Sequence, residues 1–552
     1  MSVAQPVVDP ARTTGSWSRD AVIYQVYVRS FADSDGDGIG ALAGVTCRLD
    51  FLAGLGVDAI WLTPLYRSPM ADGGYDVADY RDVDPMFGDL GDFDRLLAAA
   101  HERGLRVIID IVPNHTSSQH VWFQAALAAA PGSPERQRFH FHSGGDTPPN
   151  DWESIFRGPA WTRLPDGDWY LHLFAPEQPD LNWDHPEVRA EFADVLRFWL
   201  DRGVDGIRID VAHGMIKAPG LPDAGRASVL LDGAHAPYFD QDGVHEIYRE
   251  WRSILDTYQP ERIAVAEAWL PSLDRTARYV RPGELHQAFN FEFLGAAWSA
   301  PGYRRVIDAS LEVMGGVGAP ATWVMSNHDV VRHASRLAAG IGGTAGGAAS
   351  ATDATALADP ALGLRRARAA TLLMLALPGS VYLYQGEELG LPEVFDLPAA
   401  ARQDPIFART DGGELGRDGC RVPLPWAGAT APYAFGPAGS VPWLPQPDGW
   451  SALTVDAQAV DPASTLTLYR EALRLRRAYP GLGDGSLVWR SAPDDAVLVF
   501  ERPGGPDGVT VVCAVNQGSD PVAAVDGELL VASGPLIDGY LPPDTAAWWA
   551  IR

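Results

Sequence analysis

Cysteine is scarce in this 552-residue chain, which contains only Cys47, Cys420 and Cys513, far apart from one another. An odd number of widely spaced cysteines does not suit the disulfide framework of a secreted domain. We therefore expect reduced thiols in the core and a cytoplasmic location. Lysine is scarcer still, because Lys217 is the only one among the 43 basic residues, a bias that we attribute to genome composition.

Two kinds of hydrophobic segment are also missing. The first twenty residues have no basic start followed by an apolar run, so they are not typical of a secretory signal. No window approaches the roughly 18 apolar residues that cross a bilayer. We expect a protein that has no membrane partner.

Positive charge is in deficit, since the formal net charge at pH 7 is -28. Nucleic acids and anionic membranes bind through an excess of Lys and Arg, so this balance excludes a nucleic-acid partner. A neutral or cationic ligand is favoured. Nothing in the composition indicates an oligomeric state.

What the sequence does contain is a repeated alternation of short apolar runs with longer segments of helical period, which is typical of βα units around a parallel sheet. Helices are predicted after these runs, for example over Asp92–Arg103 and Glu187–Arg202. Eight units favour a (β/α)8 barrel, an α/β fold, although a doubly wound sheet would give a similar local pattern. The predicted strands are Val22–Val28, Ala59–Thr63, Arg106–Ile111, Gly206–Asp210, Ile263–Glu267, Gln287–Phe291, Thr322–Met325 and Ser380–Tyr384.

Two interruptions and a change of pattern divide the chain. Residues 113–185 are too long for an ordinary βα loop and predict a small inserted domain after the third strand, so that the barrel spans 1–112 and 186–480. The Gly/Ala-rich segment 340–361 after the seventh strand predicts a flexible loop beside the active site. Residues 481–552 lose the helical period and predict an antiparallel β-domain.

Acidic residues recur just beyond predicted strand ends, where a barrel of this kind builds its active site. Asp110 lies at the end of the third strand, Asp210 ends the fourth, Glu267 ends the fifth, and Asp329 follows the seventh. A single acid at such a place is more often a helix cap. Four acids after four separate strands indicate catalysis by carboxylates.

The segments around these acids are DIVPNH (110–115), GIRIDVAH (206–213), VAEAW (265–269) and SNHD (326–329). In this order they resemble the four signature regions of the α-amylase superfamily. The runs YQVYVRSFADSDGDGIG, GYDVADY, LHLFAPEQPDLNW and GRDGCRVPLPW are similar to those of its α-glucosidase and oligo-1,6-glucosidase subgroup. The resemblance implies that Asp210 is the nucleophile, Glu267 the general acid/base and Asp329 the carboxylate that holds and distorts the sugar.

The chemistry of a retaining glycosidase is consistent with that division. It needs one ionised carboxyl group for attack and one protonated group for the leaving oxygen, about 5–5.5 Å apart. Arg208 lies two residues before Asp210 on the same strand and is expected to favour its ionised form. Glu267 has no cation nearby in the sequence and is followed by Ala268 and Trp269, a setting that favours a raised pKa.

The resemblance also implies residues that bind the terminal sugar. We expect Asp72 and Arg421 to meet at its 4-hydroxyl, Tyr75 to stack on its ring, and His115 and His328 to donate hydrogen bonds. Three residues of the inserted domain are expected to shape the entrance, although the aromatic ones suit core packing equally well: Phe156, Phe174 and Gln178.

The segment DSDGDGIG resembles a calcium loop, in which the side chains of Asp33, Asp35 and Asp37 and the carbonyl of Ile39 surround one ion. Ala41 stands where the subgroup usually has another carboxylate, which weakens the site. A structural Ca²⁺ or Mg²⁺ is expected here, with a solvated acidic turn as the alternative. No organic cofactor is expected.

The resemblance implies an exo-acting retaining α-glucosidase that releases α-glucose from maltose and short malto-oligosaccharides. The DVAHG run (210–214) resembles maltases that cleave α-1,4 bonds, whereas Val211 alone resembles α-1,6-specific members. Alternatives on the same scaffold are an oligo-1,6-glucosidase, a transglucosylase and a trehalose-synthase-like isomerase. A non-catalytic subunit is disfavoured, because such chains lack the three acids and carry a membrane span.

Overall fold

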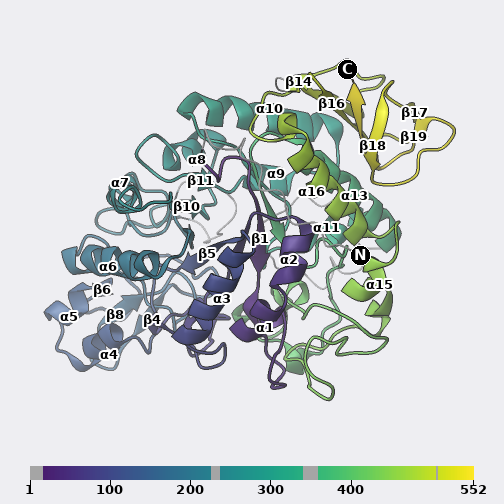
Figure 1. Ribbon diagram of the computed structural model, residues 1–552. Helices are drawn as coiled ribbons and strands as arrows, with labels where there is room; N and C mark the ends of the chain where they lie inside the picture. The colour runs from purple at the N-terminus through teal and green to yellow at the C-terminus, as the bar shows by residue number, and fades with distance from the viewer. Residues whose placement is uncertain (1–15, 226–235, 340–358, 505–507, 552) are drawn as a thin grey trace.

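The computed structural model describes residues 16–225, 236–339, 359–504 and 508–551. At its centre lies a parallel sheet in the order β11-β10-β9-β5-β2-β1-β13-β12 (Figure 1). Its strands are β1 (Val22–Val26), β2 (Ala59–Leu62), β5 (Arg106–Ile111), β9 (Gly206–Ile209), β10 (Ile263–Ala266), β11 (Gln287–Ala288), β12 (Thr322–Val324) and β13 (Ser380–Tyr384).

This order confirms the barrel and excludes a doubly wound sheet. Every pairing is parallel, the strands from β1 to β11 follow one another in chain order, and the last strand, β13, pairs with β1, so that the order is circular. At the two ends of the order, the Asn290 N–H donates to the Thr322 carbonyl at 2.9 Å and brings β11 and β12 together. Nearly every strand residue is buried, as expected for strands that have a packed barrel interior on one side and helices on the other.

Helices follow the strands and cover the outside of the barrel. Helix α3 (Leu90–Glu102) begins at a capping box formed by Asp89 and Asp92, and α6 (Pro186–Arg202) ends at Gly203, whose φ of 108° is accessible to glycine. The other main helices are α1 (Leu42–Cys47), α2 (Leu49–Leu55), α7 (Val244–Leu255), α8 (Leu273–Tyr279), α9 (Phe291–Gly295), α10 (Ala300–Val317), α11 (His333–Ala339), α13 (Pro360–Ala376), α14 (Pro405–Arg409), α15 (Val455–Ala459) and α16 (Thr465–Ala478).

Two smaller units accompany the barrel. Between β5 and α6 lie α4 (Val121–Ala128), α5 (Pro134–Gln137) and a three-stranded sheet of β6 (Phe141–His142), β8 (Trp169–Leu171) and β7 (Trp161–Arg163). After α16, an antiparallel sheet lies at the far side of the molecule from these elements (Figure 1) and confirms the C-terminal β-domain. Its order is β14 (Val488–Trp489), β15 (Val497–Arg502), β16 (Thr510–Asn516), β20 (Thr545–Ile551) and β18 (Glu528–Ala532).

Three expectations need comment. Residues 340–358 of the predicted flexible loop lie outside the described residues, and its last residues are helical because α13 begins at Pro360. Cys420 and Cys513 are buried free thiols as expected, but Cys47 is exposed at the end of α1. In the part of the chain that the structure describes, no helix is both long and apolar enough to cross a membrane.

Candidate active site

A pocket of about 870 Å³, counted out to its mouth, opens at the carboxyl ends of the barrel strands. It contains all three acids that the resemblance implies, together with polar and aromatic side chains from the loops. Its lining includes Asp72, Tyr75, His115, Phe156, Phe174, Asp210, Val211, Glu267, Trp269, His328, Asp329, Asp404, Ile406 and Arg417.

Arg208 lies at the base of this pocket and links three carboxylates. It projects from β9 and is 1% exposed. Its Nη1 donates to Asp210 Oδ1 at 2.6 Å and to Asp110 Oδ1 at 2.9 Å, while Nη2 lies 3.6 Å from Glu267 Oε2. Asp110 is therefore a buried supporting residue and does not line the pocket, where the other three acids lie.

Because the carboxylates share one guanidinium, the pKa of Asp210 is shifted in a different direction from the one that the sequence predicts. Burial raises the pKa of Asp210 above its ordinary value, and Arg208 opposes this rise without cancelling it. The expectation that Arg208 favours ionisation of Asp210 is right in direction, but the net shift is upward because burial outweighs this effect and because Glu267 and Asp329 add negative charge nearby. A proton is thus held readily within this cluster of acids.

Glu267 follows β10 and is 4% exposed. Burial raises its pKa, as predicted, although Arg208 opposes the rise and is closer than the sequence indicated. Both carboxylate oxygens accept a hydrogen bond: Oε2 from the Val211 N–H at 2.7 Å and Oε1 from the Trp269 indole at 2.5 Å.

Asp329 differs from the other two acids because cations surround it. Burial works against its ionisation, but His328, Arg417 and Arg421 together hold the pKa of Asp329 well below its usual range. The guanidinium of Arg417 lies 3.0 Å from Asp329 Oδ1, and that of Arg421 lies 2.9 Å from the same oxygen. Asp329 is therefore suited to remain a carboxylate throughout a reaction.

The prediction that Asp72 meets Arg421 is wrong. Arg417, four residues earlier, donates from Nη2 to Asp72 Oδ1 at 2.6 Å and also contacts Asp404. Arg421 donates instead to the His328 carbonyl at 2.8 Å and to Asp329, and does not line the pocket. Arg417 and Asp404 are two lining residues that the sequence did not indicate, although Arg417 lies within the quoted GRDGCR run. The others include Ile155, Arg157, Val330, Ile406 and Gly416.

Gln178 also has a different position from the one expected. It is fully buried and does not line the entrance, and its side-chain amide donates to Asp72 Oδ2 at 3.2 Å and lies 3.0 Å from His115 Nε2. Phe156 and Phe174 do line the pocket, with ring centroids 5.7 Å apart. Gln178 is therefore a supporting residue behind the polar side chains.

Tyr75, His115 and His328 all line the pocket, and their contacts with a sugar stay a prediction. Tyr75 and His328 stack with centroids 5.1 Å apart and an interplanar angle of 9°. The Tyr75 hydroxyl donates to Asp110 Oδ2 at 3.0 Å, and His328 Nδ1 lies 2.7 Å from the Gln25 amide. Both rings are thereby fixed along one wall of the pocket.

Lys217, the one lysine of the chain, also supports this region. Its ammonium group is buried, 2.7 Å from Asp180 Oδ2 and 2.9 Å from Asn114 Oδ1. It connects the segment after Asp210 with the inserted region. The scarcity of lysine was attributed to genome composition, and the sequence did not indicate that Lys217 has this structural role.

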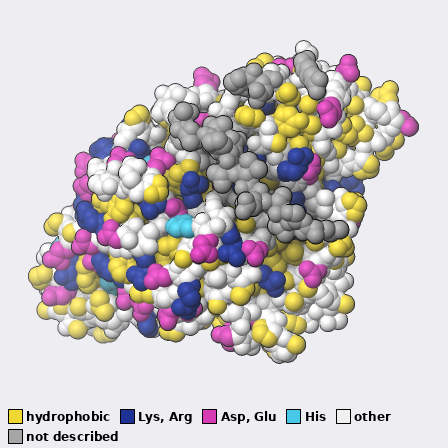
Figure 2. Space-filling view, viewed as in Figure 1, with side chains coloured by type: hydrophobic (Ala, Val, Ile, Leu, Met, Phe, Trp, Pro, Cys, Tyr) yellow, Lys and Arg dark blue, Asp and Glu magenta, His cyan; other side chains and the backbone are white. Residues whose placement is uncertain are grey.

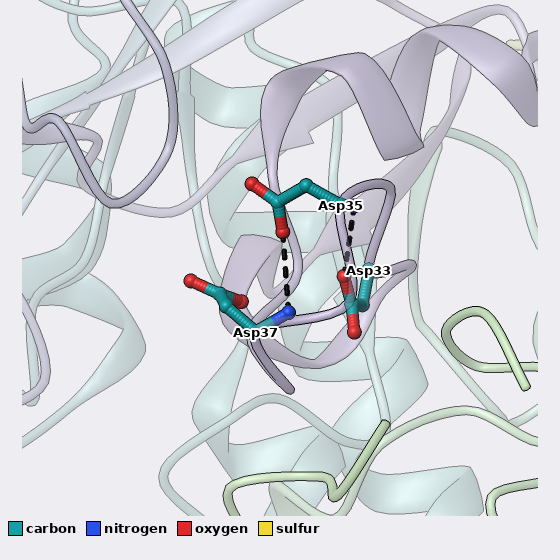
Figure 3. Close-up of side chains that lie close together, drawn as sticks. All are labelled: Asp33, Asp35 and Asp37. Carbon is teal, nitrogen blue, oxygen red and sulfur yellow. Dashed lines mark hydrogen bonds between the residues drawn. The ribbon is translucent and has the colours of Figure 1, made fainter. Parts of the chain in front are cut away.

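The acidic loop after β1 lies outside the pocket. Figure 3 shows the carboxyl groups of Asp33, Asp35 and Asp37 projecting from one tight loop, and their oxygens lie within 4.8 Å of one another. Asp33 accepts N–H groups from Asp35, Gly36 and Gly38, which curls the backbone around its carboxylate. All-oxygen ligands on a curled backbone fit a hard cation such as Ca²⁺ or Mg²⁺.

Comparison with known proteins assigns this architecture to a family. The family described as "Alpha amylase, catalytic domain" matches residues 25–485, which is most of the chain. The protein belongs to the α-amylase family. The matched α-amylase region contains every residue of the pocket and the acidic loop, and ends before β14.

Relatives within the α-amylase family cover nearly the whole chain. A protein of Rhizobium meliloti (strain 1021) named "Probable alpha-glucosidase" is 39% identical over 91% of this chain and 90% of its own length. An "Oligo-1,6-glucosidase" of Parageobacillus thermoglucosidasius is 32% identical over 95% of each chain. A solved α-glucosyl transfer enzyme, XgtA, superposes with a TM-score of 0.84 at 37% identity, over 98% of this chain and 100% of its own.

Proposed function

We propose that this protein is an exo-acting retaining α-glucosidase that releases α-glucose from the non-reducing end of maltose and short malto-oligosaccharides. The observation that carries the proposal is the arrangement of charge in the pocket. Asp210 and Glu267 share Arg208 at its base, and the ion pair of Asp72 with Arg417 lies beside Asp329. The relatives named α-glucosidase support the same substrate class.

In the proposed reaction Asp210 attacks the anomeric carbon while Glu267 donates its proton to the leaving oxygen. A covalent glucosyl ester forms on Asp210, and Glu267 then takes a proton from the water that hydrolyses it. Asp329, which is held ionised, accepts hydrogen bonds from sugar hydroxyls, with His328 and His115 as donors. The pair of Asp72 and Arg417 occupies the end of the pocket, so the terminal sugar has no room for a preceding one.

The experiment is proton NMR of a fresh reaction with maltose, in which α-glucose must appear before β-glucose because two inversions restore the configuration. Asp210→Asn and Glu267→Gln are expected to lower the rate by several orders of magnitude without unfolding the protein. Glu267→Gln should lose less on an activated aryl glucoside. Initial β-glucose, or a nearly normal rate in either variant, would overturn the proposal.

Two alternatives remain worth a direct test. The similarity to an α-glucosyl transfer enzyme favours transfer to an acceptor as a second outcome, and the oligo-1,6-glucosidase relative favours α-1,6 bonds. A panel of maltose, isomaltose, sucrose, trehalose and maltotriose, with all products identified, separates hydrolysis from transfer and from isomerisation. We also propose a cytoplasmic location, which fractionation of the source cells would check.

For the acidic loop we propose a structural Ca²⁺ or Mg²⁺. Asp33, Asp35, Asp37 and the Ile39 carbonyl would hold it, and the ion would neutralise carboxylates that lie close together. It would have no part in the chemistry, since the loop does not line the pocket.

A further inference from the structure

The proposed acid/base accepts hydrogen bonds from two N–H donors, although it must also carry a proton. The Val211 N–H and the Trp269 indole each take one oxygen of Glu267, at 2.7 and 2.5 Å. A protonated carboxyl group turns one oxygen into a donor, so it cannot accept two such bonds equally well. One of these bonds must weaken each time Glu267 becomes an acid.

The Trp269 side chain is held firmly in the position from which it donates. Its ring lies flat on that of Phe291, with centroids 3.5 Å apart and an interplanar angle of 4°. Trp269 is 8% exposed and packs in the cluster that also contains Phe289 and Tyr382. The indole is a donor only, so it stabilises the carboxylate form of its partner and offers nothing to the acid form.

We propose, building on the proposed function, that Trp269 is a positioning residue for the acid/base. Its indole N–H, fixed by the ring of Phe291, orients Glu267 and favours the ionised state that activates water in the second step. The backbone N–H of Val211 cannot take this part independently, because it follows Asp210 directly and moves with the nucleophile. Trp269 is therefore expected to set the balance between the acid and base forms of Glu267.

The test is Trp269→Phe, which keeps a flat ring against Phe291 and removes the N–H donor together with part of the indole ring system. The basic limb of the kcat/KM profile on maltose, where Glu267 loses its proton, should move upward by about one pH unit, the size expected for one hydrogen bond to a charged group. The acid limb of kcat on an activated aryl glucoside, where hydrolysis of the ester is slow, should move in the same direction. A purely structural role would lower rates and leave both limbs in place.

Trp298→Phe is the matched control. The Trp298 indole also donates to a carboxylate, Asp544 Oδ1 at 2.6 Å, but outside the pocket, so both limbs should stay unchanged. Phe291→Leu keeps the N–H and removes the stacked ring, and should shift the limbs by a smaller amount. If Trp269→Phe does not fold, the shift of the two limbs in Phe291→Leu tests the proposal instead.

The outcomes separate this inference from the proposed function. If the wild type is active with a bell-shaped profile and Glu267→Gln is inactive on maltose, yet both limbs of Trp269→Phe coincide with the wild type, the inference alone is overturned. If Glu267→Gln retains the basic limb on maltose, the acid/base assignment fails and the inference fails with it.

Discussion

Arg208 is one cation beside three buried carboxylates, so it cannot neutralise all of their negative charge. It contacts Asp110 and Asp210 directly and lies near Glu267, and all four side chains are nearly or fully buried. Removing carboxylates from water raises their pKa values, and one cation offsets only part of that rise. Such a cluster takes up a proton at a pH where isolated aspartates are ionised, which is the condition that a buried general acid needs.

The pH dependence of activity should reflect this shift. Asp210, the proposed nucleophile, must be ionised to attack, and since its pKa is raised, activity should fall as pH drops through a value above the ordinary aspartate range near 4. The measurement is kcat/KM on maltose against pH. With α-glucosyl fluoride, whose leaving group needs no proton, the basic limb should disappear and the acid limb should remain. An acid limb at or below pH 4 would contradict the argument.

Asp72 supplies a second prediction at this scale. It is 3% exposed, and its loss leaves Arg417 without the partner that closes the end of the pocket. Asp72→Ala should lower kcat/KM on maltose roughly 100-fold, corresponding to about 3 kcal/mol for the loss of a charged hydrogen-bonding group, while Arg417 keeps Asp404 and Asp329 as partners. The matched control is Asp82→Ala, because Asp82 pairs with Arg67 at the surface with 33% of its side chain exposed, and its activity should stay near that of the wild type.

Among the elements, α14 connects the inserted region to the loop that follows β13. Arg409, its last residue, donates from Nε to the carbonyls of Phe156 and Arg157 at 3.0 Å each. Arg157 in turn pairs with Glu414 through two hydrogen bonds of 2.7 and 3.1 Å. The wall of the pocket that contains Phe156 is thus held by α14 and by Glu414 in the segment that follows it.

Arg409→Ala should therefore raise the KM for maltose several-fold and change kcat less, because it frees the wall that receives the sugar and leaves the reacting carboxylates in place. Comparison of initial rates over a range of maltose concentrations measures this split. Arg197→Ala is the control, since Arg197 on α6 pairs with Asp194 outside the pocket with 50% of its side chain exposed, and surface pairs of this kind contribute at most about 1 kcal/mol. A loss confined to kcat would show that the contact has another role.

Helices and strands could be predicted from the sequence where the local pattern of residues alone determines the structure. Ser380–Tyr384 was predicted to the residue because an apolar, β-branched and aromatic run has no competing signal. The sixth strand is shorter than predicted because the Asn290 side chain accepts the Phe293 N–H and starts a helix there. Arg417 was missed because a short 3-10 turn between two arginines decides which one faces Asp72, and sequence spacing carries no such information.

Asp404 was also missed, because its place in the sequence indicates only a local role. Its position before Pro405 is typical of a helix cap, and its Oδ1 does accept the Ile406 N–H at 3.0 Å. Its other oxygen pairs with Arg417 at the pocket, a long-range contact that the local role conceals. Contacts between loops that are distant in sequence therefore account for most of what the sequence argument missed.

At the scale of the whole molecule, charge is mixed. On the face that Figure 2 shows, positive and negative side chains lie among one another and form no continuous basic surface. The expectation that neither nucleic acid nor an anionic membrane is the partner rests on the net charge of -28 and stays a prediction. The field of such a surface disfavours anionic ligands. A neutral sugar, recognised by hydrogen bonds inside a pocket, is not affected by it.

The acidic loop connects distant parts of the chain, so a bound cation should act on the stability of the whole barrel. Asp33 donates its N–H to the Phe435 carbonyl at 2.8 Å, and the Trp443 N–H donates to the Gly38 carbonyl at 3.0 Å. An ion that holds Asp33, Asp35 and Asp37 would thus fasten the segment after β1 to the segment near residue 440.

Because such an ion binds only the folded form, adding Ca²⁺ or Mg²⁺ at about 100 times its Kd should stabilise the protein by roughly 2.7 kcal/mol. For a chain of 552 residues this corresponds to a rise in Tm of about 2 °C above the EDTA-treated protein. Thermal melts at a series of cation concentrations measure it, and catalytic rates below the melting range should stay unchanged. Asp35→Asn should abolish the rise, whereas Asp82→Asn, an exposed aspartate on β4 (Asp79–Val83), should keep it. A Tm independent of cation and EDTA, or the same rise in Asp35→Asn, would leave the loop as a solvated acidic turn.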